Sequence, residues 1–146
     1  MSKLVTTPFV SAGIKHNGNL ILYESKGDMI KRHKINGQYR QVTGSGNVVV
    51  ALNDDGGITI FCFMNGNMTV LEKHGFFIKV CICENTIIVL SNDGSVHTWL
   101  LTFNSSKVPT PPGITIKAYE YFHKNILLHY CCIFLAYHFI YWLRSS

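Results

Sequence analysis

The residues of this 146-residue chain that could carry catalysis or bind a metal are seven histidines, five cysteines and eight carboxylates. The histidines are scattered and do not form the HExxH pattern of a zinc enzyme. The cysteines are odd in number and include no CxxC pair, which argues against a disulfide framework and against a zinc site. We therefore expect free thiols, no metal and no cofactor. The cysteines are Cys62, Cys81, Cys83, Cys131 and Cys132.

One glycine-rich run comes close to a catalytic motif and to a phosphate-binding motif without matching either. Residues 44–46 read Gly-Ser-Gly, but the GxSxG spacing of a nucleophile elbow is missing. No Walker lysine follows this glycine-rich run, so a phosphate-binding loop is not indicated. The carboxylates Asp55 and Asp93 each precede a glycine and are explained by turns. We predict that the chain has no catalytic residues and is not an enzyme.

Basic residues gather in the first part of the chain. Such a stretch could contact phosphate or an acidic surface of a partner. Surfaces that bind nucleic acid usually add exposed stacking aromatics, and only Tyr39 is nearby, so we do not expect nucleic acid as a partner. The alternative is a solvated outer strand on which basic residues discourage edge pairing. The candidate binding patch consists of Lys26, Lys31, Arg32, Lys34 and Arg40.

The composition indicates a folded, β-rich chain. Apolar residues make up 47% and charged residues 14% of the chain, with a formal net charge of +5. A disordered chain would be richer in charge and poorer in aromatic residues, and the length suits one domain. Because residues 1–13 lack the apolar core of a signal peptide, we expect a cytoplasmic or nuclear protein rather than a secreted one.

Glycines recur at a fixed interval of 38 residues in two series. Apolar and aromatic positions follow the same interval, as in Tyr23, Phe61 and Trp99. The interval divides the chain into units 3–40, 41–78 and 79–116, with a partial, degenerate unit at 117–146. The turn residues that we predict to be structural are Gly18, Asp55, Gly56, Asp93, Gly94, Gly37, Gly75 and Gly113.

Each unit contains the same succession of short apolar runs and turns. In the second unit, the run at 48–52 is followed by Asp-Gly and by a second run at 57–61. Runs of this kind predict strands, and Asp-Gly predicts a tight hairpin because glycine accepts a positive φ. Four short antiparallel strands in about 40 residues are typical of a propeller blade. We therefore predict an all-β fold, a β-propeller-type array of four-stranded antiparallel blades in an incomplete or open ring. A barrel or a sandwich is the alternative.

The third unit resembles a known repeat family. Residues 84–99, ENTIIVLSNDGSVHTW, are similar to the regulator of chromosome condensation repeat, which reads loosely G-E-N-H-T-x-x-L-x-x-D-G-x-V-x-x-W-G. Thr86 stands at the family's His, and Leu100 stands at the Gly after Trp. WD-type repeats, the second choice, share D-G-x-V-x-x-W. Either resemblance implies a propeller that is a rigid platform for binding proteins, with no further site to carry over.

The last unit departs from the pattern. Residues 126–143, ILLHYCCIFLAYHFIYWL, carry no formal charge and reach the length of a candidate membrane helix. Three interpretations are open: a degenerate buried blade, a C-terminal membrane anchor, and a tail altered by a change of reading frame. Known propellers usually have four or more blades. We therefore expect a fragment of a larger propeller or self-association, with an open array as the third alternative.

These features together predict a non-catalytic protein-interaction platform built from propeller blades. The expected contact surface is the loop face that carries the Asp-Gly turns, or the basic region of the first unit. One alternative is a small β-rich cytosolic domain that is anchored to a membrane through Ile126 to Leu143. Another is a propeller enzyme without a visible site. The partner is expected to be a protein that no motif identifies, or a second copy of the chain.

Overall fold

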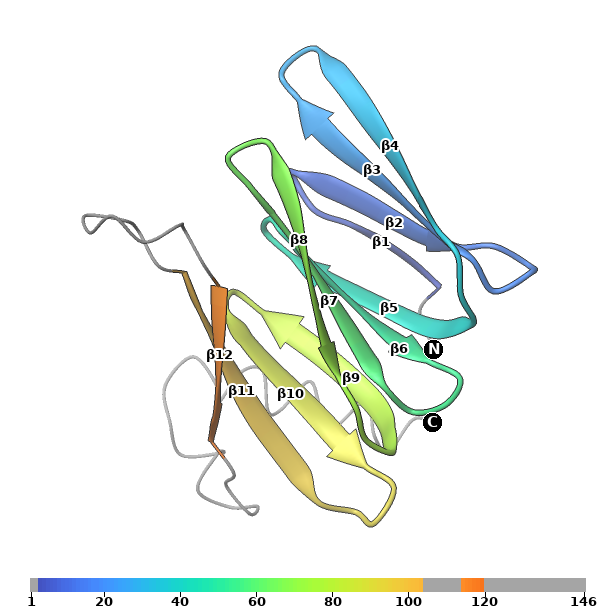
Figure 1. Cartoon of the computed structure of the whole chain (residues 1–146), viewed down its shortest axis with the longest axis vertical. Helices are drawn as coiled ribbons and strands as arrows, with labels where there is room; N and C mark the ends of the chain where they lie inside the picture. Colours follow the sequence, from blue (N-terminus) through green and yellow to red (C-terminus); the bar gives the residue numbers. More distant parts are fainter. Residues whose placement is uncertain (1–2, 104–113, 120–146) are drawn as a thin grey trace.

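In the described part of the chain all regular secondary structure is β-strand (Figure 1). The computed structural model describes residues 3–103 and 114–119. The prediction of an all-β fold is confirmed. The strands are β1 (Leu4–Thr6), β2 (Val10–Ile14), β3 (Leu20–Lys26), β4 (Met29–Ile35), β5 (Tyr39–Ser45), β6 (Val48–Asn53), β7 (Ile58–Met64), β8 (Asn67–Lys73), β9 (Phe77–Cys83), β10 (Thr86–Ser91), β11 (Val96–Phe103) and β12 (Ile114–Tyr119).

The strands form three sheets, each made of four consecutive antiparallel strands. We call these the first sheet (β1–β4), the second sheet (β5–β8) and the third sheet (β9–β12). Figure 1 shows them stacked one after another along the long axis of the molecule, with the second sheet in the middle. The predicted four-stranded antiparallel units are therefore present.

The hairpin between the second and third strand of each sheet contains a glycine with positive φ. These glycines are Gly18, Gly56 and Gly94, with φ of 88°, 93° and 88°. In two of the turns an aspartate side chain holds the backbone: Asp55 Oδ1 accepts the N–H of Gly57, and Asp93 Oδ1 accepts the N–H of Ser95, both at 2.9 Å. Residues within these two turns therefore stabilise the hairpins locally, through hydrogen bonds from the backbone to an aspartate side chain.

Strand β6 shows why the second sheet contains uninterrupted apolar runs. All residues from Val48 to Leu52 are fully buried, although their side chains point alternately to opposite faces. Val48, Val50 and Leu52 enter the core that the second sheet shares with the third. Val49 and Ala51 enter the core that it shares with the first sheet. A strand buried on both faces needs apolar residues at every position.

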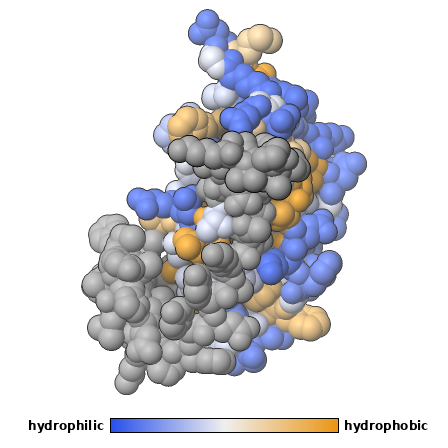
Figure 2. Space-filling model, turned by 60° about the vertical axis from the view of Figure 1, so that its left-hand side comes forward, coloured by the Kyte–Doolittle hydropathy of each residue, from blue (hydrophilic) through white to orange (hydrophobic). Residues whose placement is uncertain are grey.

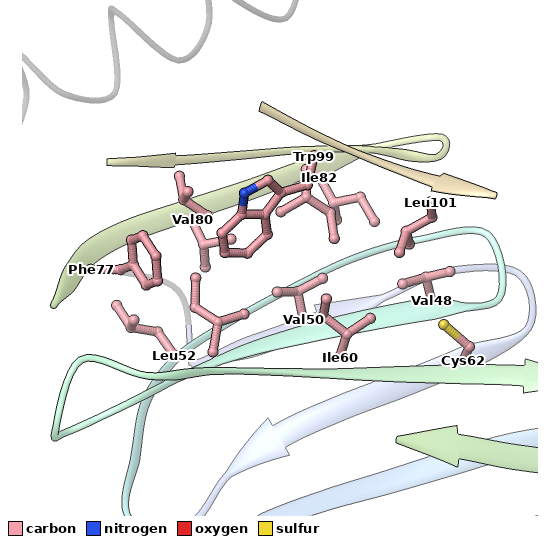
Figure 3. Close-up of a cluster of buried hydrophobic side chains, with 13 residues drawn as sticks. Val48, Val50, Leu52, Ile60, Cys62, Phe77, Val80, Ile82, Trp99 and Leu101 are labelled. Carbon is pink, nitrogen blue, oxygen red and sulfur yellow. The ribbon is translucent and has the colours of Figure 1, made fainter. Parts of the chain in front are cut away.

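The two cores hold the sheets together. Figure 3 shows the core between the second and third sheets, in which side chains of β6 and β7 face those of β9 and β11. Apolar burial is the dominant favourable contribution to such packing. The core of Figure 3 consists of Val48, Val50, Leu52, Ile58, Ile60, Cys62, Phe77, Val80, Ile82, Ile87, Val89, Trp99 and Leu101. The other consists of Val10, Ala12, Leu20, Leu22, Tyr39, Val42, Val49, Ala51, Phe61 and Phe63.

Contacts between neighbouring sheets repeat with the same interval as the sequence. The N–H of Tyr39 donates to the carbonyl oxygen of Gly18, and the N–H of Phe77 donates to that of Gly56, both at 2.9 Å. Each bond joins the first strand of one sheet to the β-turn of the sheet before it. Both pairs are shifted by 38 positions, from 18 to 56 and from 39 to 77. The repeat therefore specifies how sheets join as well as how each sheet folds.

The glycine series that begins with Gly37 and Gly75 has a role other than the predicted turns. A Cβ atom on Gly37 would lie 2.7 Å from Cε2 of Tyr39, and one on Gly75 would collide with the ring of Phe77. Both glycines therefore make room for the aromatic ring two residues later, and neither has a positive φ. Gly113, the third member of the series, lies outside the described residues.

Two of the three sheets begin slightly before the predicted units. The second and third sheets start at Tyr39 and Phe77, two residues before the predicted boundaries at 41 and 79. Strand β12 spans the predicted boundary at 116 and pairs with β11 as the fourth strand of the third sheet. Residues 120–146, with the candidate membrane segment 126–143, lie outside the described residues. Within the described ranges no helix is long and apolar enough to cross a membrane.

Candidate interaction surface

The five basic residues of the candidate patch do not share one surface. Cross-strand pairing places Arg32 opposite Tyr23 and Lys34 opposite Ile21, which puts both basic side chains on the same face of the first sheet. Lys31 lies opposite Glu24 and therefore points to the other face. The strand period of two residues divides the patch.

Arg40 belongs to the junction between sheets. Its Nη2 donates to the carbonyl oxygen of Phe77 at 2.8 Å, and its side chain is partly buried. The guanidinium of this β5 residue thereby ties the second sheet to the first strand of the third. We assign Arg40 a structural role and do not include it in a binding surface.

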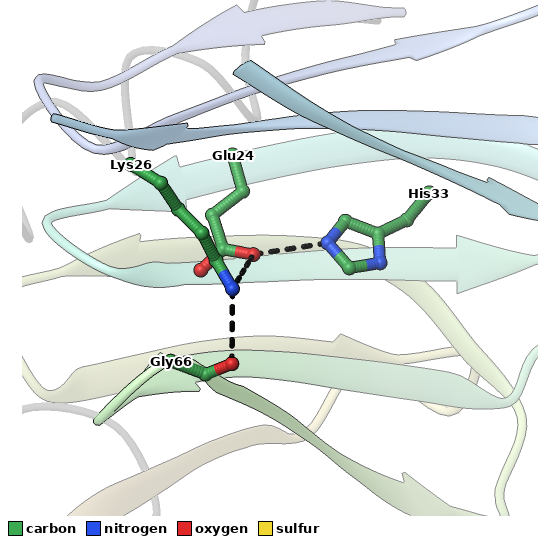
Figure 4. A network of polar contacts seen from close by, with 4 residues as sticks. All are labelled: Glu24, Lys26, His33 and Gly66. Carbon is green, nitrogen blue, oxygen red and sulfur yellow. Dashed lines mark hydrogen bonds and ion pairs between the residues drawn. The ribbon is translucent and has the colours of Figure 1, made fainter. Parts of the chain in front are cut away.

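A buried carboxylate organises the other face of the β3–β4 hairpin (Figure 4). Glu24 is 7% exposed, and its Oε1 lies 3.0 Å from Nε2 of His33 and 3.9 Å from Nζ of Lys26. Nζ of Lys26 also donates to the carbonyl oxygen of Gly66 at 3.1 Å. Because Gly66 lies in the β7–β8 turn, this network joins the tips of two neighbouring sheets. These contacts give Glu24, His33 and Lys26 a structural role in holding the first sheet against the second.

A second polar chain contains the residue types of a hydrolase triad in a different order. Ser95 Oγ donates to Asp93 Oδ1, and Nε2 of His97 lies 3.1 Å from the same hydroxyl. A nucleophilic serine needs histidine to accept its proton and a carboxylate to orient that histidine. Here the hydroxyl proton points to Asp93 instead, so His97 donates to Ser95. The hydrogen bonds from Ser95 lower the pKa of Asp93 and stabilise the turn.

A polar hollow lies at the edge where the Asp-Gly turns gather. It has a volume of about 360 Å³ and is lined by residues of the β4–β5 link, β5, β6, the β6–β7 turn, β7 and β8. Three carboxylates at its walls favour a positively charged guest. The lining residues are Gln38, Tyr39, Asn53, Asp54, Asp55, Thr59 and Glu72.

Tyr39 forms the aromatic wall of this cavity. Burial raises the pKa of the phenol, the hydrogen bond with Thr59 lowers it, and the negative charge of Glu72 raises it further. Since the net shift is upward, the phenol stays protonated at neutral pH and acts as a neutral hydrogen-bonding group. In the described ranges no group of three or more His, Cys, Asp or Glu side chains has a geometry that could hold a metal ion.

An exposed aromatic residue lies next to the β6–β7 turn, which forms part of the cavity wall. Phe76 is 71% exposed, and its backbone lies against Gly56, next to the cavity residue Asp55. The carbonyl of Phe76 accepts the N–H of Asn92, just as the carbonyl of Gln38 accepts the N–H of Asp54, both at 2.8 Å. Gln38 and Phe76 are therefore equivalent positions of two sheets. We call the cavity together with Phe76 the loop-edge surface.

Hydrophilic residues dominate the other end of the molecule. Figure 2 shows them at the top of the view, where the β3–β4 hairpin of Figure 1 projects, with a few apolar residues among them. Met29 and Ile30, at this hairpin, are 75% and 70% exposed. Charged residues neighbour these exposed apolar side chains: Lys26 lies opposite Met29, and Lys31 follows Ile30.

The sequence predicted the loop-edge surface only in outline. It predicted a contact surface on the Asp-Gly face, but it indicated only a turn role for Asp55 and did not single out Gln38 or Glu72. The run Asn53-Asp54-Asp55 was the available signal. Thr59 and Glu72 meet in this cavity because β7 pairs with β8 in a register that only the folded sheet defines.

Among the described residues, Cys62, Cys81 and Cys83 form no disulfide, and burial makes Cys62 and Cys81 poorly reactive. Cys62 is buried in the core of Figure 3, and burial raises its pKa to about 11. Burial also raises the pKa of Cys81 to about 12, with a contribution from nearby Cys83. Thiols of this kind are protonated and inert at neutral pH.

Comparisons with known proteins do not assign a family to the chain. No protein-family model matches the sequence, and no curated protein matches it either. The similarity to the regulator of chromosome condensation repeat and to the WD repeat therefore rests on the sequence pattern alone, which is clearest at residues 84–99 and weaker at residues 46–61. In its described residues, the chain is an all-β protein made of repeated four-stranded antiparallel sheets.

Proposed function

We propose that this chain is a non-catalytic protein-interaction module whose three sheets are consecutive blades of a β-propeller-type array. The closest contacts between sheets involve the first and second strands: β1 and β2 lie against β5 and β6, which in turn lie against β9. Strands β4 and β8 form the outer edges of the first and second sheets (Figure 1). Four-stranded sheets that pack on one another in succession, with their first strands in contact and their fourth strands outermost, are arranged like the blades of a propeller.

The loop-edge surface is the binding site in this proposal, and the cavity beside Tyr39 is the observation that carries it. The carboxylates of Asp54 and Glu72 line a hollow of about 360 Å³, which is large enough for a lysine or arginine side chain. The attraction between a basic side chain and these nearby carboxylates outweighs its repulsion by the net positive charge of the chain. Distant charges contribute little, because salt screens them within about 10 Å. The partner is a protein segment with a basic side chain.

Phe76 provides the second half of the recognition. An exposed aromatic ring beside a polar cavity is a common anchor in protein interfaces, where aromatic residues are enriched. A partner whose basic residue enters the cavity would place a neighbouring apolar residue on Phe76. The module thus binds a basic residue that has an apolar neighbour, and this defines the class of peptide to be tested.

A peptide-display selection on the immobilised full chain tests the proposal. Selected peptides should be enriched in lysine or arginine next to an apolar residue. The double variant Asp54→Asn, Glu72→Gln should bind them about tenfold more weakly, which corresponds to about 1.4 kcal/mol, and added salt should weaken binding to the wild type. Asp55 stays unchanged because its Oδ1 holds the turn.

The matched control is Asp28→Asn, which removes an exposed carboxylate in the β3–β4 turn, at the opposite end of β4 from the cavity residue Gln38. It should leave binding unchanged. Enrichment of peptides without basic residues, or equal binding by the double variant and the wild type, would overturn the proposed site. Absence of any enrichment over an empty support would overturn the binding function itself.

A further inference from the structure

One face of the first sheet is open to solvent although the equivalent face of the second sheet is buried. The first sheet lies at one end of the stack, so one of its faces packs on the second sheet and no described sheet covers the other (Figure 1). On this outer face, Leu4 and Tyr23 are 74% and 44% exposed. Their equivalents 38 positions later, Val42 and Phe61, are 0% and 1% exposed. We call the outer face of the first sheet the open face.

Cross-strand pairing shows which residues share the open face. Residues that are directly paired in an antiparallel sheet have their side chains on the same face, and the face alternates along each strand. The open face therefore contains two neighbouring rows of paired residues that run across β2, β3 and β4. The first row is Ser11, Tyr23 and Arg32, and the second row is Gly13, Ile21 and Lys34.

The first row is the polar counterpart of an apolar row in the second sheet. The residues 38 positions later are Val49, Phe61 and Val70, which are paired in the same order. Serine, tyrosine and arginine thus stand where the second sheet has hydrocarbon side chains, and each of the three adds a hydrogen-bond donor. Ser11 Oγ lies 2.7 Å from Oγ1 of Thr6, and because this hydrogen bond uses one of their two hydroxyl protons, the pair keeps one to donate.

A hollow in the open face joins this row to apolar side chains. It has a volume of about 390 Å³, and its lining includes the whole first row together with Leu4 and Ile21. Gly13 also lines it and widens it, since a Cβ atom there would lie in ordinary contact, 3.6 Å from Cδ1 of Leu4. Ala51 and Val89 occupy the equivalent positions of the other two sheets. The space beside Gly13 is therefore specific to the first sheet.

The charges of the two rows are positive. Arg32 and Lys34 lie on the open face, whereas Glu24 points to the other face, where it contacts His33 and Lys26. Within the described ranges, neither Arg32 nor Lys34 forms an ion pair with a carboxylate. A guanidinium presents its N–H groups in a fork that matches the two oxygens of a carboxylate. Charge and shape together favour an acidic group that is attached to an apolar one.

We propose that the open face binds a partner protein through an acidic side chain next to an apolar one. The carboxylate accepts hydrogen bonds from Arg32 and from the hydroxyl groups of the same row, and the apolar side chain enters the hollow against Leu4 and Ile21. A hollow receives a single side chain better than it receives a flat membrane surface. This second site has the opposite charge to the loop-edge surface and does not depend on binding there.

A peptide-display selection with a preclearing step tests the proposal. The library first passes over an immobilised row variant, Ser11→Val, Tyr23→Phe, Arg32→Val, which carries the residues of the second sheet at these positions. This step removes peptides that bind elsewhere, including the loop-edge surface. Peptides then retained by the wild-type full chain should be enriched in aspartate or glutamate next to an apolar residue. They should bind the row variant about tenfold more weakly, the loss expected for one hydrogen bond to a charged group.

Two further variants separate charge from shape. Lys31→Val removes the same charge from the same strand on the opposite face, so it is the matched control and should leave binding unchanged. Gly13→Val fills the hollow with the residue of the third sheet and should abolish any preference for leucine over alanine at the apolar position of the peptide. If circular dichroism shows that the row variant is unfolded, Arg32→Gln replaces it in both steps.

Several results would overturn the proposal. Retained peptides without acidic residues, or no retained peptides at all, would remove the acidic partner, and an equal loss of binding in Lys31→Val would reduce the effect to net charge. Retention of phosphatidylserine vesicles by the wild type but not by the row variant would assign the face to a membrane instead. Binding of the selected peptides should persist in Asp54→Asn, Glu72→Gln, and its loss there would place them at the loop-edge surface.

Discussion

Phe77 donates its backbone N–H to the carbonyl oxygen of Gly56 at 2.9 Å, across the boundary between the second and third sheets. The turn that Gly56 forms lies directly against the entering strand: a Cβ atom on Gly56 would be 3.0 Å from Cα of Phe76 and 3.1 Å from the carbonyl oxygen of Gly75. This glycine is therefore required twice, once for the hairpin and once for the approach of the next sheet.

Gly56→Ala should destabilise the fold more than Gly94→Ala. The two glycines have similar φ, 93° and 88°, so a left-handed backbone costs each alanine about 1–2 kcal/mol. A Cβ atom on Gly94 would meet no described atom within 4 Å beyond its chain neighbours, whereas at Gly56 backbone atoms must move. That overpacking should add about 1–3 kcal/mol to the loss at Gly56. Urea denaturation measures both, and equal losses would contradict the close approach.

Truncation of two adjacent phenylalanines should change the free energy of unfolding by very different amounts. Phe77 is 8% exposed and packs edge-on against Trp99, with ring centroids 5.3 Å apart. Phe77→Ala should lower the free energy of unfolding by about 3–5 kcal/mol. Phe76→Ala, on a 71% exposed side chain, should change it by no more than about 0.5 kcal/mol. Similar denaturation midpoints for the two variants would refute the burial assignment.

The buried pair of Glu24 and His33 should show energetic coupling. Glu24→Ala leaves His33 and Lys26 without their carboxylate and should cost about 1–3 kcal/mol. A double-mutant cycle with His33→Ala should give a coupling energy of at least about 0.5 kcal/mol. Lys31→Ala, which removes an exposed residue opposite Glu24 in the sheet, is the control and should have little effect. Additive losses in the cycle would mean that the contact contributes nothing.

Cys62 should react slowly with iodoacetamide at pH 8 in the folded protein and rapidly in denaturant. Its pKa is raised to about 11 by burial, so hardly any thiolate exists at pH 8, and the core blocks access. Mass spectrometry of the digested protein locates the modified residues and separates Cys62 from the other thiols. Prompt modification of Cys62 in the folded protein would contradict its place in the core.

The same shift predicts a loss of stability in alkaline solution. Between the ordinary value of 9.0 and about 11, the unfolded chain loses the Cys62 proton while the folded chain keeps it. The unfolded state then binds fewer protons, so the free energy of unfolding falls as the pH rises through this range. Cys62→Ala should show a weaker decline over the same range than the wild type. Identical pH dependence in both proteins would assign the decline to other groups.

The sequence determined the local structure of this protein to a large extent. The alternation within strands, the Asp-Gly turns and the 38-residue interval are local signals, because strand pairing across a short hairpin depends on neighbouring residues. From them follow the all-β fold, the four-stranded sheets and the hairpins at Gly56 and Gly94. The uninterrupted run at 48–52 also indicated that one strand is buried on both faces.

Only the tertiary structure decided which residues meet across sheets. Arg40 belongs to a basic cluster in the sequence, yet it bonds to Phe77, 37 residues later, and so holds a junction. Gly37 and Gly75 make room for rings rather than turns, and the cavity beside Tyr39 brings together Asp54 and Glu72 from different elements. These relationships depend on the packing of one sheet on the next. Side chains that are distant in the chain meet there, and no short-range pattern encodes their partners.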